Sequence, residues 1–149
     1  MYNEQIEALI SAALTDGVLT EKEKQDNDEN KKIISKGSVP TGASRDGELI
    51  VKDMAALVDK LLKGCNISLN EVAYVGIATP GTIDDKNGVV VRAYNLPFNH
   101  FPIADIFKRY LPIKQVFVAN DANAAALAEA KGGAGKGCKD AVMITLGTG

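Results

Sequence analysis

The segment QVFVANDANAAALAEA at residues 115–130 combines a strand signal and a helix signal with an acid between them. The β-branched and aromatic run VFV predicts a short strand, and the alanine-rich run after Asp121 predicts a helix. Asp121 therefore lies where a strand ends and a helix begins, the place where open α/β sheets bind ligands. The helix N-terminus favours an ionised carboxylate, which can accept a proton from a substrate hydroxyl. The alternative is that Asp121, or Asn120, only caps the helix.

Two further apolar runs end in small or glycine-containing turns. VAYVGIATPGT at residues 72–82 ends in Thr-Pro-Gly-Thr, and DAVMITLGTG at residues 140–149 ends in Gly-Thr-Gly. Glycine lets a backbone approach a ligand closely, and consecutive N–H groups in such turns bind anions, although Gly-Thr-Gly is also an ordinary tight turn. Together the three strand ends predict one cleft, with an acid beside one strand and a phosphate cradle beside another.

The pattern around these segments predicts an α/β fold. The turn DDKNG at residues 84–88 predicts a β-hairpin, because Asn-Gly favours the hairpin turn. Apolar residues at helical spacing predict an amphipathic helix over residues 47–64. The remaining expected elements are strands at 33–40, 72–78, 115–119 and 140–146, and helices at 103–110 and 122–131.

The first residues follow a different pattern. Residues 4–14 place apolar side chains at helical spacing, which predicts a helix, whereas residues 20–32 contain no apolar residue. This start resembles the opening of a small TerB-like helical module. We expect residues 1–26 to form a helical segment with a polar linker, and residues 27–149 to form a separate unit.

From about residue 27 to residue 149 the chain resembles the ROK family of sugar kinases, the bacterial glucokinase-like branch of the actin and hexokinase fold. Four segments match that family in order and spacing, and the Asn-Asp-x-Asn-Ala run is the most specific part of them. They are VGIATPGTID at 75–84, NLPF at 95–98, VANDANAAALAEAKGGAGKG at 118–137 and ITLGTG at 144–149. The resemblance implies a ribonuclease-H-like lobe that is incomplete, because only the middle of the family's amino-terminal lobe is present.

The resemblance also implies a function and a set of site residues. The reaction is the ATP-dependent phosphorylation of a hexose, with glucose as the default, and Mg²⁺ accompanies the ATP. Asp121 is implied as the base that deprotonates a sugar hydroxyl, and Asn120 as a hydrogen-bonding partner of the sugar. Gly81 and Asn95 line the same pocket by this resemblance. Gly147, Thr148 and Gly149 begin a phosphate-binding loop for ATP, and the parent enzyme is expected to be a homo-oligomer.

The sequence departs from the family at both ends. The Asp-x-Gly-Gly-Thr hairpin that cradles the nucleotide phosphates in the family has no counterpart here. The family's further sugar-binding residues and its zinc loop would follow residue 149. From these departures we expect the chain to be an inactive fragment or chimera of a sugar kinase. The alternative function is a non-catalytic, sugar-sensing ROK regulator.

Composition excludes several other classes of protein. The net charge of −2 does not indicate a nucleic-acid partner, and residues 1–24 carry five acids and two bases. No apolar run approaches the roughly 18 residues of a membrane span. Cys65 and Cys138 lie far apart, which favours free thiols in a cytoplasmic protein. The only histidine, His100, has no cysteine or acid at ligand spacing, so no protein-held metal site is expected.

Overall fold

The computed structural model describes residues 5–11 and 33–144 of the chain. In this part of the chain, strands and helices combine in an α/β fold, as predicted. The elements in chain order are β1 (Gln5–Ser11), β2 (Ile33–Pro40), α2 (Gly47–Gly64), the short 3₁₀ helix η1 (Leu69–Glu71), β3 (Val75–Thr79), β4 (Thr82–Asp84), β5 (Val89–Arg92), β6 (Asn99–Phe101), α3 (Ile103–Tyr110), β7 (Val116–Asn120) and α4 (Asp121–Gly132).

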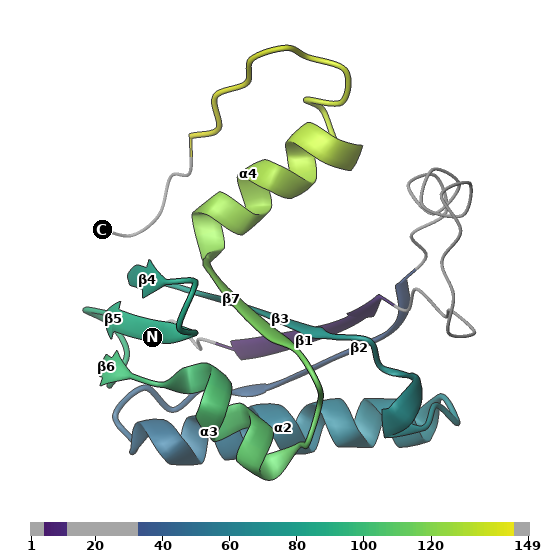
Figure 1. The fold of residues 1–149 in the computed structure, drawn as a ribbon, viewed down its shortest axis with the longest axis vertical. Helices are drawn as coiled ribbons and strands as arrows, with labels where there is room; N and C mark the ends of the chain where they lie inside the picture. Colours follow the sequence, from purple (N-terminus) through teal and green to yellow (C-terminus); the bar gives the residue numbers. More distant parts are fainter. Residues whose placement is uncertain (1–4, 12–32, 145–149) are drawn as a thin grey trace.

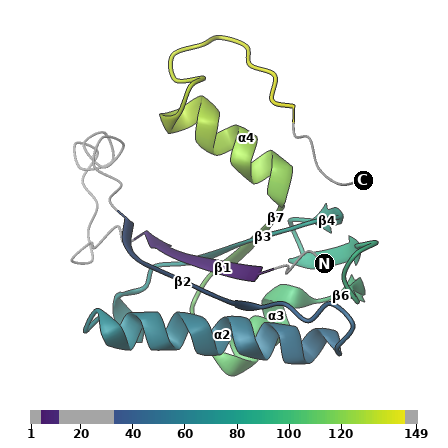
Figure 2. The same ribbon diagram turned by 180° about the vertical axis from the view of Figure 1, so that it is seen from behind.

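The strands form three small sheets among the described residues. β1 and β2 are antiparallel, β3 and β7 are parallel, and β4, β5 and β6 form an antiparallel meander. Helices α2 and α3 lie together on one side of these strands, and α4 projects from the opposite side (Figures 1 and 2). The helix that begins with Asp121 is therefore separated from the two helices that cover the sheets.

The hydrophobic core lies between the strands and helices α2 and α3. It is built from aliphatic and aromatic side chains of α2, β3, β5, α3 and β7 and of the loops beside them. Its most deeply buried members are Ile50, Val51, Val90, Ile103 and Phe107, each at most 1 % exposed. Burial of apolar surface of this kind is the main force that stabilises a small domain.

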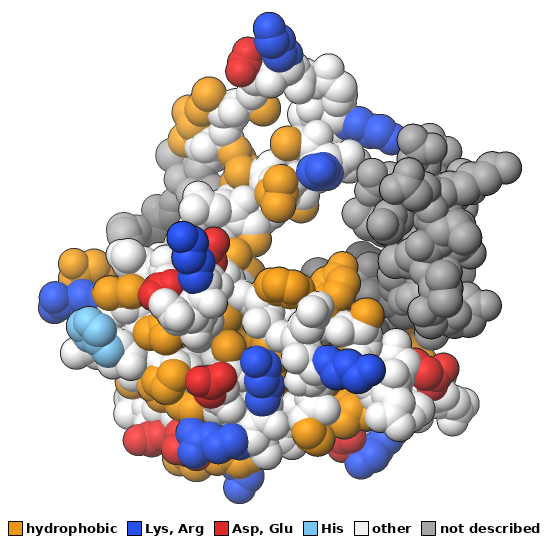
Figure 3. All heavy atoms as spheres, viewed as in Figure 1, with side chains coloured by type: hydrophobic (Ala, Val, Ile, Leu, Met, Phe, Trp, Pro, Cys, Tyr) orange, Lys and Arg blue, Asp and Glu red, His pale blue; other side chains and the backbone are white. Residues whose placement is uncertain are grey.

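The parallel pair β3–β7 has one buried and one exposed face. Ile77 lies opposite Val118 in the register, and both side chains are buried in the core. Gly76 lies opposite Phe117, whose ring is exposed and packs edge-on against the exposed ring of Tyr74. The strands alternate sides as the pleat requires, and only one side is covered by α2 and α3. Hydrophobic side chains are visible on the surface of α4 and of the body beneath it (Figure 3).

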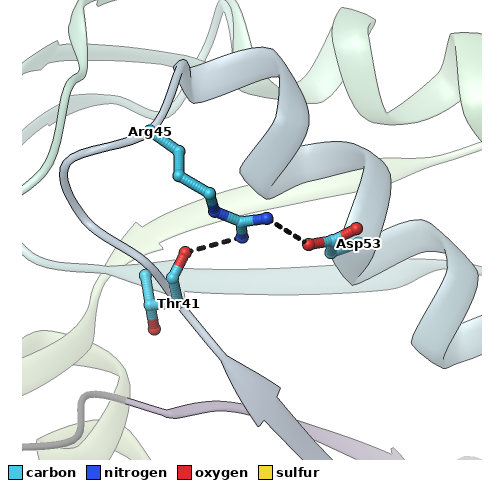
Figure 4. Close-up of polar contacts among 3 residues, drawn as sticks. All are labelled: Thr41, Arg45 and Asp53. Atoms are coloured by element: carbon cyan, nitrogen blue, oxygen red, sulfur yellow. Dashed lines mark hydrogen bonds and ion pairs between the residues drawn. The ribbon is translucent and has the colours of Figure 1, made fainter.

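The predicted helix at 47–64 is confirmed as α2, and its start is fixed by a cap and by an arginine. The Asp46 side chain accepts a hydrogen bond from the Glu48 N–H at 2.8 Å. Arg45 reaches along the loop before the helix, where Nη1 meets the Asp53 carboxylate at 2.8 Å and Nη2 donates to the Thr41 carbonyl at 2.8 Å (Figure 4). The guanidinium thus joins the end of β2 to the second turn of α2.

The predicted hairpin is confirmed by β4 and β5, and the predicted helix at 103–110 by α3. Gly88 in the hairpin turn has φ +65°, and a Cβ on it would lie 2.5 Å from the Cβ of Ala104. The Gly88 carbonyl accepts a hydrogen bond from the Ala104 N–H at 3.1 Å. The hairpin turn is therefore packed directly on the first turn of α3, and glycine is needed there for space and for backbone conformation.

The expected helix over residues 4–14 is wrong for Gln5–Ser11, which form strand β1. Ile6, Ala8 and Ile10 also alternate along the sequence, so a strand fits the same residues as a helix does. β2 offers β1 an antiparallel partner over its whole length, with Gln5 opposite Pro40. Pairing with a neighbouring strand has prevailed over local helix propensity. The division of the chain near residue 26 stays a prediction.

Two expected strands also differ from the structure. The strand expected at 72–78 begins later, at Val75, because its partner strand β7 begins at Val116, which lies opposite Val75 in the register. The strand expected at 140–146 is not formed over residues 140–144, where Val142 and Ile144 are 90 % and 78 % exposed. An apolar run becomes a strand only where another strand can pair with it, and no described strand pairs with these residues.

Candidate active site

The parallel pairing of β3 and β7 places two of the predicted strand ends side by side. Thr79, the last residue of β3, lies opposite Asn120, the last residue of β7. The Thr-Pro-Gly-Thr turn and the Asn-Asp turn therefore leave the sheet at the same edge, although Gly81 and Asn120 are 39 positions apart in the sequence. This edge is the carboxyl end of parallel strands, where α/β proteins bind their ligands.

Asn120 uses both ends of its side-chain amide within the protein. Its Oδ1 accepts a hydrogen bond from the Asn123 N–H at 3.1 Å, so Asn120 is the N-cap of α4. Its Nδ2 donates to the Gly81 carbonyl at 3.1 Å. The amide group therefore contacts the turn after β3 and the first turn of α4 at once.

Asp121 is the first residue of α4, and its side chain is exposed. Its Oδ1 accepts a hydrogen bond from the N–H of the next residue, Ala122, at 2.8 Å. Of the two capping alternatives raised by the sequence, the structure shows that Asn120 caps the helix. The accessible carboxylate therefore lies at the N-terminus of α4, the end of the helix that carries partial positive charge.

Gly81 lies in the turn between β3 and β4 with φ +108°, a conformation that side-chain-bearing residues rarely adopt. A Cβ on Gly81 would overlap the main-chain oxygen of Arg92 and lie 3.0 Å from the Cα of Ala93. The turn is thus pressed against the end of β5. The sequence suggested close approach to a ligand as the reason for this glycine, but it gave no signal that Gly81 packs on the backbone at Arg92.

The other site residues from the sequence lie elsewhere or outside the described part of the chain. Asn95 is exposed and lies in the loop between β5 and β6, two residues after Ala93, which touches the turn at Gly81. The structure therefore brings Gly81, Asn120 and Asp121 together and places Asn95 on an adjoining loop. Gly147, Thr148 and Gly149 lie outside the described residues.

Clusters of metal-ligating side chains are absent from the part of the chain that the structure describes. Within residues 5–11 and 33–144, no group of three or more His, Cys, Asp or Glu side chains is placed to hold a metal ion. His100 is exposed in β6, and its Nδ1 lies 3.0 Å from the Asn99 Oδ1.

None of the described helices is long and apolar enough to span a bilayer.

Sequence comparison finds relatives of this chain among known proteins. Residues 24–149 match the ROK family. A glucokinase from Halalkalibacterium halodurans is 38 % identical over 117 residues, which cover 78 % of this chain and 35 % of that protein. A glucokinase from Thermotoga maritima is 36 % identical over 122 residues, which cover 81 % of this chain and 37 % of that protein. The chain thus spans about a third of the length of these relatives.

Solved structures give the same assignment. The ROK family glucokinase from Streptomyces griseus, determined in complex with glucose and AMPPNP, matches 71 % of this chain and 31 % of its own. The match has a sequence identity of 36 % and a TM-score of 0.62. The fold is accordingly part of a lobe of the actin and hexokinase type, as the sequence predicted. Because the family match covers most of the sequence, this chain belongs to the ROK family.

Proposed function

We propose that this chain carries the catalytic base and part of the sugar pocket of an ATP-dependent hexose kinase, with glucose as the first substrate to test. The observation that carries this proposal is the position of Asp121. Its exposed carboxylate lies at the start of α4, next to a turn that Asn120 fastens to the same sheet edge. The proposed base, Asp121, then lies beside the turn that is proposed to contact the substrate.

The chemistry needs little from the protein beyond position and charge. A sugar hydroxyl donates its proton to the Asp121 carboxylate while its oxygen forms a bond to the γ-phosphorus of ATP. The bond between that phosphorus and the bridging oxygen breaks, and ADP leaves with the electron pair. Phosphoryl transfer of this kind depends mainly on alignment of the attacking oxygen and on stabilisation of charge.

Gly81, Asn95 and Asn120 are proposed to line the sugar pocket with Asp121. Asn120 keeps one N–H of its amide and one lone pair of Oδ1 for a ligand, since each of its two recorded hydrogen bonds uses only one of them. The Gly81 carbonyl already accepts a hydrogen bond from Asn120, so its N–H is the group that we propose to contact the sugar. Exposed Asn95 would approach from the adjoining loop.

ATP would supply the transferred phosphoryl group, and Gly147, Thr148 and Gly149 are proposed to contact its phosphates. Support comes from the relatives: several are glucokinases, and the Streptomyces griseus enzyme was determined with glucose and AMPPNP. We further propose a cytoplasmic location, in line with the free thiols Cys65 and Cys138. Mg²⁺ and a homo-oligomeric state are proposed from the family resemblance alone.

A chimera tests the proposal. Residues 33–149 would replace the matching segment of the Streptomyces griseus glucokinase, which supplies the rest of the fold. We expect the chimera to form a hexose phosphate from glucose and ATP, measured by a coupled assay of ADP release. The unaltered parent enzyme, carried through the same preparation, shows what full activity looks like.

The same chimera separates the kinase from the sugar-sensing regulator. A regulator's segment would allow glucose binding, measured by calorimetry, without glucose-dependent ADP release. That outcome in a folded chimera would overturn the proposed kinase function. The excess of acids in residues 1–24 already counts against a DNA-binding start, because DNA binding relies on basic side chains.

A further inference from the structure

We infer that Asn120 is a positioning residue that ties the turn after β3 to the N-terminus of α4, so that Gly81 and Asp121 move as one unit. The inference rests on the proposed function for its catalytic meaning, but the tie itself is a property of the described residues. It concerns a contact between two strand ends and is separate from any contact of Asn120 with a sugar.

The first support is the pair of hydrogen bonds made by one amide group. Nδ2 donates to the Gly81 carbonyl, and Oδ1 accepts from the Asn123 N–H, each at 3.1 Å. An amide side chain can donate a hydrogen bond at one end and accept one at the other. An aspartate at this position would still cap the helix, but it would put an acceptor oxygen against the Gly81 carbonyl.

The second support is that neither end of the tie can move freely. Gly81 is held on its far side by the backbone at Arg92 and Ala93, where no room is left for a Cβ. Asn120 belongs to β7 and pairs with Thr79 in the parallel register. The hydrogen bond between Asn120 and Gly81 and the pairing of Asn120 with Thr79 therefore link the end of β7 to β3 and to the turn that follows it.

The third support is that α4 has few other contacts to hold its start in place. No residue of α4 is buried, and Leu127 is 60 % exposed. A helix without a buried face gains little orientation from packing. The position of Asp121 relative to the sheet is then set by β7 and by the two hydrogen bonds of the Asn120 side chain.

A measurement on the unaltered full chain tests the hydrogen bond between Asn120 and Gly81 directly. In protein labelled with ¹⁵N and ¹³C, a hydrogen bond from Asn120 Nδ2 to the Gly81 carbonyl gives a scalar coupling between that nitrogen and the Gly81 carbonyl carbon. We expect this coupling to be observed without any sugar. Its absence, with both signals assigned and sharp, would overturn the inference and leave the proposed kinase function untouched.

Substitutions then separate the tie from the cap. Asn120→Asp keeps the cap acceptor and removes the donor, so the Gly81 carbonyl signal should move upfield while the Asn123 amide stays protected from exchange. Asn120→Ala should alter both. Asn123→Asp adds the same charge one turn away and should leave the Gly81 carbonyl signal in place, because only the Asn123 backbone N–H takes part in the cap.

A last comparison tests whether the two ends move together. Pro80→Ala disturbs the turn, and with Asn120 present we expect the Asp121 amide signal to shift in response. In the Asn120→Asp background that response should be lost. An Asp121 shift of the same size in both backgrounds would show that the disturbance travels by another route and would contradict the positioning role.

Discussion

Gly81 lies directly against the main-chain oxygen of Arg92, so the turn after β3 and the end of β5 touch through their backbones alone. This contact exists only because residue 81 has no side chain, and its φ of +108° adds a second reason for glycine. The turn that carries the proposed sugar contact is therefore fixed from two sides, by Arg92 and by the amide of Asn120.

Gly81→Ala should lower the free energy of unfolding by about 2 kcal/mol or more, since both the backbone conformation and the space are lost. The matched control is Gly76→Ala, because nothing lies within 4 Å of a Cβ at Gly76. That control should be neutral or stabilise slightly. Urea denaturation of both variants measures the difference, and equal midpoints would mean that the turn is not packed on β5 as described.

The two phenylalanines Phe107 and Phe117 should respond in opposite ways to truncation. Phe107 is 1 % exposed in the core, whereas Phe117 is 56 % exposed on the uncovered face of β3–β7. Phe107→Ala should cost about 3–5 kcal/mol, enough to unfold a marginal domain. Phe117→Ala should cost well under half as much. Thermal unfolding followed by circular dichroism measures the loss of stability of each variant. A larger loss for Phe117→Ala than for Phe107→Ala would contradict the assignment of the buried and exposed positions.

Arg45→Lys should destabilise the chain by about 1 kcal/mol. The planar guanidinium contacts both the Asp53 carboxylate and the Thr41 carbonyl, whereas an ammonium group cannot make both contacts at once. The control is the same substitution at Arg109, whose Nη1 lies 3.8 Å from the Glu48 carboxylate. Arg109→Lys should change stability very little. Denaturant midpoints of the two variants would be compared, and an equal effect would remove the special role of the loop before α2.

Acid should weaken the hairpin turn at Asp84. The hydrogen bonds from the Asn87 side chain and backbone hold the pKa of the Asp84 carboxyl below its ordinary value. A lowered pKa in the folded state means that this contribution is complete above the ordinary pKa and is lost as the pH falls through the lowered one. In an NMR titration, Asn87→Ala should raise the pKa of Asp84 toward its ordinary value. Lys86→Ala, which removes only the weak attraction between the Lys86 charge and this carboxylate, should change the pKa far less.

Much of the fold could be predicted from local patterns in the sequence. Helix α2 begins and ends at the predicted residues, because its apolar stripe is long and Asp46 caps it. The hairpin followed from Asn87-Gly88 in the same way. Gln5–Ser11 could not be assigned locally, since their apolar residues fit both periods and the pairing with β2 decides.

For the candidate site, the sequence predicted the strand ends that meet at one edge of the sheet, but not the contacts between them. The strand-to-helix junction at Asp121 could be read from adjacent residues. The hydrogen bond between Asn120 and Gly81 joins residues that lie 39 apart, and the packing of Gly81 on Arg92 depends on how the meander folds back. Such relationships arise from tertiary structure, so no local pattern announces them.

The catalytic role of Asp121 is the central claim, and turnover by the chimera with Asp121→Asn tests it most directly. The amide keeps the shape of the side chain but cannot take the proton, so kcat should fall by about 10²-fold or more. The affinity for glucose should change much less. Asp105→Asn, which alters an exposed acid in the first turn of α3, is the control and should keep the parent activity. A kcat for Asp121→Asn within a few-fold of the parent value would contradict the assignment of Asp121 as the base.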